Sequence, residues 1–249
     1  MKNVINFLLI LILFNSCLET LDSNKVVGLI VKNGITSIPA DNKSTVTLVS
    51  YISIDSDEDK RSIEFHTSGG VFTKNNENTL SVIARDTVEI ENQKYLSAEA
   101  ILRSSNTIAP EIIVTTRVKS FSAKTYLAFT ESVPNKVLLS SNKFGIVNSY
   151  DSEVILTALV ESFSGFPSNG YTVEFLVYDA ENGSKFSNPL FRERKLSVNS
   201  EGKASVIFSS GNLMKGDTSF LGDLLIKVNI LNVPTLEDSI ILNVSKKTD

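Results

Sequence analysis

Short runs in which apolar and polar residues alternate recur along most of the chain. These runs are rich in Val, Ile, Thr and Phe, and clusters of Asn, Ser, Asp and Gly separate them. A period of two is typical of strands that bury one face, and no window after Cys17 has the spacing of an amphipathic helix. Short strands at this spacing favour a β-sandwich. The predicted strands are Ser44–Ile54, Ser62–Thr67, Leu96–Leu102, Ile112–Val118, Val154–Val160, Tyr171–Tyr178, Lys203–Phe208 and Leu224–Ile230.

Two of these strands predict which side chains face the core. Residues two apart on a strand point to the same face. In the first strand we expect the buried positions to be Val46, Leu48, Ile52 and Ile54. In the strand Tyr171–Tyr178 we expect them to be Val173, Phe175 and Val177.

Short segments of the first half recur in the same order in the second half. The pairs are Asn24–Val26 with Asn135–Val137, Val46–Leu48 with Val154–Leu156, Ile63–Phe65 with Val173–Phe175, Ala98–Asn106 with Ala204–Asn212, and Ile112–Val114 with Leu224–Ile226. An ordered repeat of this kind indicates two copies of one all-β unit. We place the first domain at residues 25–130 and the second at 135–249, with Pro134 between them.

The second unit carries an ordered set of motifs. They are Val154-x-Leu156-x-Ala158, the turn Gly165–Pro167, Val173-x-Phe175 and the step Gly202–Ala204. This order resembles the bacterial Ig-like domains of the invasin and intimin type, in which a strand is followed by a G-x-P turn, V-x-F and a G-x-A step. The resemblance implies two tandem immunoglobulin-like β-sandwiches.

The first unit resembles the same family less closely. Its segment Ile38–Thr45 is similar to the A-D-G-x-S sequence that precedes the second strand of these domains, with Asn42 at the Gly position. The G-x-P turn is missing, and the charged segment Asp55–Arg61 takes its place. Only the stalk-type module is represented, so the resemblance does not by itself imply adhesion.

The N-terminal residues resemble the signal peptide of a bacterial lipoprotein. Lys2 precedes the apolar run Phe7–Phe14, which is shorter than the roughly 20 residues of a membrane-spanning helix but suits a secretory signal. The segment Phe14–Cys17 is similar to a lipobox, with a small residue before the cysteine and Phe14 where Leu is usual. An ordinary signal peptide followed by a chance cysteine is the alternative.

Cys17 is the single cysteine of the chain, so no internal disulfide is possible and a lipid would occupy its thiol. We expect residues 1–16 to be removed, Cys17 to carry the lipid that holds the protein at a membrane, and residues 17–24 to form a tether. By resemblance to lipoprotein sorting, Leu18 after the cysteine favours the outer membrane. Whether the protein faces the periplasm or the cell surface is open.

Composition narrows the classes of partner and chemistry. The chain has 24 Lys and Arg against 28 Asp and Glu, a net charge of −4, which argues against nucleic acid as a partner. One His and one Cys cannot assemble a His- or Cys-based metal cluster. We therefore expect no cofactor, no metal centre and no enzymatic activity.

Several local motifs suggest chemistry but have simpler interpretations. The acidic run Asp55–Asp59 could offer oxygens to Ca²⁺, but Lys60 follows where an EF-hand has glycine, so we expect a solvated loop. His66 is expected to be a structural or surface histidine. Ser68–Gly70 is a turn rather than a phosphate site. Asp86–Val88 and Asp238–Ile240 resemble glycosylated D-[ST]-aliphatic sites of some bacteria, although such tripeptides also occur by chance.

Aromatic residues mark a candidate binding end. In an Ig-type sandwich the loops after the first, third and fifth main strands lie at the end where the chain leaves the domain. In the second unit this end lies away from an N-terminal lipid. Exposed aromatic residues are frequent binding anchors, and the alternative is that these rings cover the core. The candidate residues are Phe144, Tyr150, Phe186, Met214 and Phe220.

Phe163 and Phe166 flank Gly165 in a loop at the opposite end of the second unit. The related domains usually have polar residues at both places. We expect at least one ring to pack against residues 130–135 or the adjoining end of the first unit, which would restrict the angle between the domains. Packing into the core of the second unit, or a partner site, are the alternatives.

Two functions fit these observations. The first is a non-enzymatic, lipid-anchored Ig-like protein of the outer membrane or cell surface, acting as a protein-binding, adhesion or scaffold module. The second is a carbohydrate-binding accessory lipoprotein of a glycan-uptake system. The absence of Trp weakens the second, although the chain has 6 Tyr.

Overall fold

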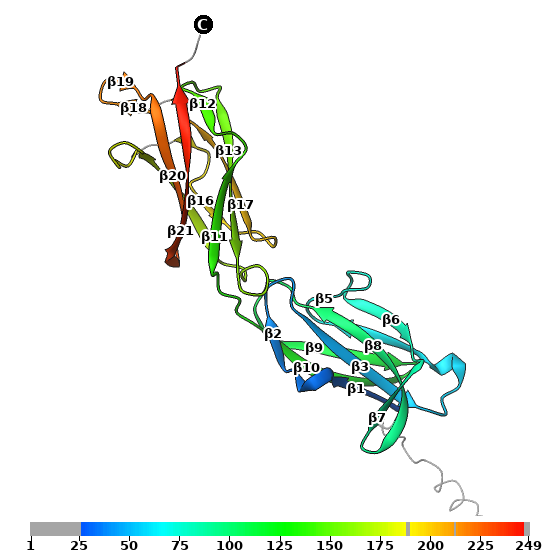
Figure 1. Cartoon of the computed structure of the whole chain (residues 1–249). Coiled ribbons are helices and arrows are strands. Elements are labelled where there is room, and N and C mark those ends of the chain that lie inside the picture. The colour runs from blue at the N-terminus through cyan, green and yellow to red at the C-terminus, as the bar shows by residue number, and fades with distance from the viewer. Residues whose placement is uncertain (1–25, 188–189, 212, 247–249) are drawn as a thin grey trace, which may run out of the picture.

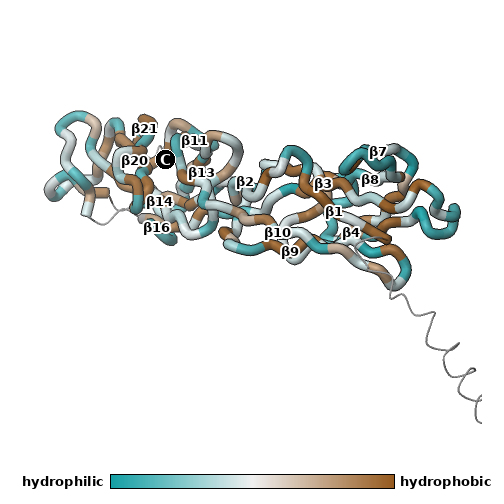
Figure 2. The backbone as a smooth tube through the Cα atoms, turned by 90° about the horizontal axis from the view of Figure 1, so that it is seen from below, coloured by the Kyte–Doolittle hydropathy of each residue, from teal (hydrophilic) through white to brown (hydrophobic). Residues whose placement is uncertain are grey.

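A computed structural model describes residues 26–187, 190–211 and 213–246. In this part of the chain the strands form two β-sandwiches that lie end to end in both backbone views (Figure 1, Figure 2). We call residues 27–130 domain 1 and residues 136–245 domain 2. Among the described residues, no helix has the length and hydropathy needed to cross a membrane. The prediction of an all-β chain is confirmed.

Domain 1 consists of two sheets that face each other. The order in one sheet is β1-β3-β8-β5, with β7 also paired to β8. Its strands are β1 (Val27–Val31), β3 (Thr45–Ser53), β5 (Val71–Phe72), β7 (Asp86–Ile90) and β8 (Gln93–Arg103). The order in the other sheet is β2-β10-β9-β4-β6. Its strands are β2 (Ser37–Pro39), β4 (Ser62–Thr67), β6 (Thr79–Ile83), β9 (Ala109–Val118) and β10 (Phe121–Thr130). Short 3₁₀ turns lie at Lys32–Gly34 and Glu58–Lys60.

Domain 2 repeats this plan. One sheet has the order β11-β13-β17-β15 and the other has the order β12-β21-β20-β14-β16. The strands are β11 (Lys136–Ser141), β12 (Gly145–Val147), β13 (Glu153–Glu161), β14 (Thr172–Asp179), β15 (Leu190–Phe191), β16 (Lys195–Ser197), β17 (Lys203–Ser209), β20 (Gly222–Ile230) and β21 (Val233–Ser245). A small hairpin of β18 (Met214–Lys215) and β19 (Thr218–Ser219) precedes β20. In each domain the first strand is divided, and its second part, β2 or β12, runs parallel to the last strand.

Strand pairing confirms the internal repeat. Leu48 pairs with Ala100 in domain 1, and Leu156 pairs with Val206 in domain 2, which are the residues that the repeat matches. The other sheet of each domain also agrees with the repeat. Phe65 of β4 pairs with Thr116 of β9, and at the matched positions Phe175 of β14 pairs with Val228 of β20. The two domains therefore share their register as well as their topology.

The repeat alignment is wrong by one residue in the first strand. Val27 pairs with Ile52, and Val137 pairs with Val160, so Val27 rather than Val26 is the counterpart of Val137. Val27 and Val137 are both buried and point into their cores. Because a shift of one residue would turn every side chain of the strand to the other face, burial decides the register here.

The core of each domain is apolar packing between its two sheets. Phe65, Phe72 and Leu48 are completely buried in domain 1, and Phe175, Phe208 and Leu156 are completely buried in domain 2. The core predictions hold for Val46, Leu48 and Ile52 and for the three residues of β14. Ile54 is the exception, because β3 ends at Ser53 and the chain turns away, leaving Ile54 42% exposed.

Loss of a buried ring should destabilise the domain that contains it. Phe175→Ala removes a fully buried side chain that packs beside Phe191, so we expect the free energy of unfolding of domain 2 to fall by about 3–5 kcal/mol. Urea unfolding followed by circular dichroism measures this. Phe163→Ala is the matched control, since its 93% exposed ring predicts a change within about 0.5 kcal/mol. Equal effects of the two changes would contradict the assigned core.

Candidate functional site

Three of the candidate aromatic and Met side chains are exposed at the end of domain 2 that lies farthest from domain 1. This end carries β12, the β18–β19 hairpin and the C-terminal end of β21 (Figure 1). Phe144 is 67% exposed, Tyr150 is 60% exposed and Met214 is 48% exposed. We call this end the tip.

Two other candidate residues do not offer a binding surface. Phe220 is fully buried, and its ring meets the half-buried ring of Phe186 edge to face, with ring centres 5.2 Å apart. The backbone N–H of Phe220 donates to the carbonyl of Leu213, which closes the β18–β19 segment over the core. Phe220 is therefore not an exposed anchor, the alternative that its ring covers the core holds, and Phe186 contributes mainly to packing.

Sequence reasoning missed Leu221, which is 50% exposed at the tip. The available signal was the pair of consecutive apolar residues, Phe220 and Leu221, just before β20. Neighbouring residues in extended backbone point to opposite sides. When Phe220 enters the core, Leu221 must therefore face water.

The loop between β13 and β14 lies directly against domain 1. Nζ of Lys43 lies 4.6 Å from the centre of the Phe166 ring, and the backbone N–H of Phe166 donates to the carbonyl of Asp41 at 3.0 Å. Gly165 is buried at this contact, where a Cβ would come within 2.7 Å of the Asp41 carbonyl oxygen. The missing side chain therefore allows the two backbones to approach.

Phe166 meets the expectation that at least one of the two rings packs against domain 1, and Phe163 does not pack there. Its ring is 93% exposed. The turn explains this, because the N–H of Ser162 donates to the carbonyl of Gly165 and the chain folds back between them. Gly165 and Phe166 then face domain 1, while Phe163 lies on the outside of the turn.

Hydrogen bonds extend the contact on both sides of this loop. Ser168 Oγ donates to the carbonyl of Ala40 at 3.0 Å, and the N–H of Asn169 donates to the carbonyl of Asn106 at 2.7 Å. The connecting segment is also held, because the N–H of Ser132 donates to Ser168 Oγ at 2.8 Å. Ser132 and Ser168 are buried. These bonds tie domain 2 both to domain 1 and to the segment that joins them.

Asp41 organises the domain 1 side of the junction. This fully buried carboxylate accepts from the N–H groups of Lys43 and Ser44 and from the hydroxyl of Ser104. Burial by itself raises the pKa of Asp41, but hydrogen bonds from Ser164 of domain 2 and from Ser44 and Lys43 outweigh it and hold the pKa below its ordinary value. The ionised carboxylate therefore fixes the loop on which Gly165 rests.

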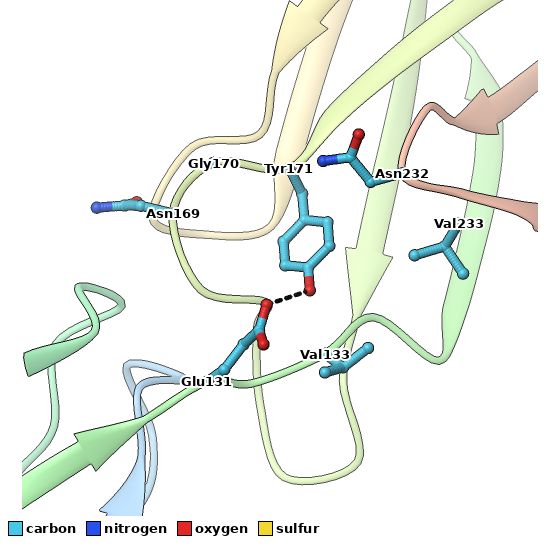
Figure 3. A pocket seen from close by; sticks show the side chains of 7 residues that line it. All are labelled: Glu131, Val133, Asn169, Gly170, Tyr171, Asn232 and Val233. Carbon is cyan, nitrogen blue, oxygen red and sulfur yellow. Dashed lines mark hydrogen bonds between the residues drawn. The ribbon is translucent and has the colours of Figure 1, made fainter. Parts of the chain in front are cut away.

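A cleft of about 500 Å³ opens on one side of the junction (Figure 3). The hydroxyl of Tyr171, the residue before β14, donates to Oε1 of Glu131 in the connecting segment at 2.8 Å. Burial and this bond to a carboxylate raise the pKa of Tyr171 to about 12. Val133 and Val233 line the same cleft. This bond braces the junction, and the raised pKa keeps the Tyr171 phenol protonated at neutral pH.

The remaining candidate motifs lie apart from these two places. In the acidic run Asp55–Asp59, Asp57 pairs with Lys60 at 2.5 Å and Asp59 pairs with Lys119 at 3.3 Å. Among the described residues, no group of three or more His, Cys, Asp or Glu side chains is placed to hold a metal ion. Thr87 and Ser239 of the two tripeptides are exposed on strands, and His66 is exposed on β4. Residues 1–16 and 17–24, including Cys17, lie outside the described residues.

Comparison with known proteins identifies the fold. No protein-family model matches the chain, and no curated protein matches it. The solved structure of invasin, described as a bacterial integrin-binding protein, matches 89% of this chain at 14% identity with a TM-score of 0.55. Both domains have the fold of invasin-type Ig-like domains. The chain covers 40% of the invasin chain, so the likeness concerns these domains and not the whole of invasin.

Two further solved structures match the chain with TM-scores below 0.5. The Yersinia pseudotuberculosis adhesin InvE matches 90% of this chain and 60% of its own at 9% identity, with a TM-score of 0.44. The D0–D1 domains of intimin match 87% of this chain and 97% of their own at 13% identity, with a TM-score of 0.30. The expected invasin-type Ig-like fold rests on the invasin match together with the sheet topology.

A side chain at Gly165 should loosen the junction of the two invasin-type domains. Gly165→Ala places a Cβ 2.7 Å from the Asp41 carbonyl oxygen and 3.0 Å from Lys43 Cβ, so the domains must separate or tilt. We expect a broader distribution of distances between spin labels on the two domains, with each domain still folded. Gly145→Ala is the control, because its Cβ meets nothing closer than 3.9 Å. Unchanged distances in Gly165→Ala would show that the contact does not hold the domains.

Proposed function

We propose that this protein is a non-enzymatic, lipid-anchored adhesion or protein-binding module of the outer membrane or cell surface. An N-terminal lipid on Cys17 holds it at the membrane, and domain 1 acts as a spacer. The tip of domain 2 presents Phe144, Tyr150 and Met214 to a protein partner. The direct contact of the two domains through Gly165 and Phe166 is the observation that carries the proposal.

The physical argument is one of preorganisation. A flexible joint would let the tip sample many orientations, and binding would lose that freedom at a cost in affinity. Three kinds of contact restrict the joint between the domains. They are the hydrogen bond from Ser168 to Ala40, the ammonium group of Lys43 over the Phe166 ring, and the packing of Gly165 against the Asp41 backbone. Exposed aromatic and Met side chains suit the centre of a protein interface, because they bury much apolar area for little loss of conformational entropy.

The anchor predicts a change in location when the lipid site is removed. Cys17→Ala should leave the protein in the soluble fraction or as an uncleaved precursor, because no thiol remains for acylation. Fractionation of cells with mass spectrometry of the N-terminus measures this, and Ser16→Ala, which keeps a small residue before the cysteine, is the control. A Cys17→Ala protein that is processed and membrane-bound like its parent would contradict lipidation.

The tip can be tested in intact cells with a photo-crosslinking amino acid. Benzoylphenylalanine at position 144, 150 or 214 should give a discrete adduct with a protein partner on illumination. Phe163 is the control position, because its side chain is more exposed than the three tip side chains but lies at the junction end of domain 2. Adducts from position 163 alone, or none from the three tip positions, would contradict the assignment.

A further inference from the structure

A separate hollow of about 440 Å³ lies on the outer face of domain 1, on the sheet that contains β4, β6, β9 and β10. It is lined by Glu64, His66, Thr79, Thr115, Arg117 and Lys124. None of these residues belongs to the tip or to the junction. The proposed function does not use this face.

Strand register brings the lining residues together. His66 of β4 lies between Thr79 of β6 and Thr115 of β9, which are its pairing partners on either side. Lys124 of β10 is in turn the partner of Thr115. Because these residues share a row across the sheet and alternate with buried neighbours, their side chains project on the same outer face.

The adjacent row adds a charged pair of positions. Glu64 of β4 lies opposite Arg117 of β9, two residues from His66 and Thr115 respectively. Arg117 Nε donates to the carbonyl of Lys119 at 2.9 Å, which orients the guanidinium. Within the part of the chain that the structure describes, neither Arg117 nor Lys124 forms an ion pair.

The charge of the hollow is opposite to that of the chain. Its lining combines two side chains that are positive at neutral pH, one imidazole and one carboxylate, while the whole chain has a net charge of −4. Arg and Lys hold carboxylate groups through charge-assisted hydrogen bonds. The Thr hydroxyls and the imidazole of His66 add donors and acceptors of the kind that sugar hydroxyls require. Groups that bind carboxylates and groups that bind hydroxyls therefore lie together in one shallow depression.

An exposed aromatic ring lies next to this depression. Tyr126 follows Lys124 by two residues on β10, so it projects on the same face, and it is 57% exposed. A tyrosine ring offers a flat apolar face with a polar edge, which matches the C–H face of a pyranose. A sheet face with a cationic hollow and a neighbouring ring fits an extended, negatively charged sugar chain.

We propose that this face of domain 1 binds an acidic polysaccharide, with Arg117 and Lys124 holding the carboxylate of a hexuronic acid unit. His66, Thr79 and Thr115 contact its hydroxyl groups, and a neighbouring unit stacks on Tyr126. The ligand and the face differ from those of the tip. A failure here would leave the crosslinking result at the tip unaffected, and the reverse also holds.

The test measures binding of the purified full chain in detergent to polygalacturonate. The wild type should bind this polymer and should not bind its fully methyl-esterified, uncharged form. Arg117→Gln with Lys124→Gln should weaken binding by about tenfold or more, as expected for the loss of two charge-assisted hydrogen bonds. Lys74→Gln with Lys94→Gln is the control, since it removes the same charge from exposed positions of domain 1 outside the hollow.

Each other outcome overturns the proposal. Equal weakening by both double variants would indicate a general charge effect, and equal binding of the methyl ester would remove the role of the carboxylate. Binding of polyglutamate as tight as that of polygalacturonate would assign the face to an acidic peptide instead. No binding of polygalacturonate at low salt would exclude the site. Thermal unfolding of each variant establishes that the domains remain folded.

Discussion

The contact of Gly165 and Phe166 with the segment Ala40–Lys43 is the constraint on which the arrangement of this molecule depends. Each sandwich pairs its own strands and has its own apolar core. The relative position of the two domains depends instead on a small polar contact. Its parts are complementary in shape, because the glycine admits a carbonyl oxygen that any side chain would displace.

The two ends of domain 2 illustrate how one fold serves different purposes. At the junction the buried groups are largely polar, and hydrogen bonds between Ser168, Asn169 and domain 1 set direction as well as proximity. At the tip, Phe144, Tyr150 and Met214 expose aromatic and thioether side chains to solvent. Fixing one end of domain 2 therefore restricts the direction in which its other end points.

The equivalent loops of the two domains differ in composition, because only the loop of domain 2 contacts another domain. In domain 2 the loop between β13 and β14 meets another domain and carries glycine, small hydroxyl residues and one packed ring. In domain 1 the corresponding loop, Asp55–Arg61, is charged and forms surface ion pairs with Lys60 and Lys119. Surface ion pairs of this kind contribute little to the free energy of folding, so the main effect of these charges is to favour solvent exposure of the loop.

The sequence by itself determined the main strands of each sheet, the repeat and six of the seven core positions named from β3 and β14. Alternation on strands such as β3 and β14 follows directly from burial of one face, and five matched segments revealed the second copy.

The tertiary structure decided which aromatic side chains are exposed to solvent. Phe220 and Phe163 are both phenylalanines in loops and cannot be told apart by local pattern. In the structure the ring of Phe220 is buried in the core, whereas the ring of Phe163 is exposed to solvent. The hollow on domain 1 was also beyond sequence reasoning, because Lys124 and His66 are far apart along the chain and meet only through the register of β4, β9 and β10. Local pattern reports whether a residue sits on a strand and faces inward, whereas the environment of a loop or of an outer face depends on which distant segments pack beside it.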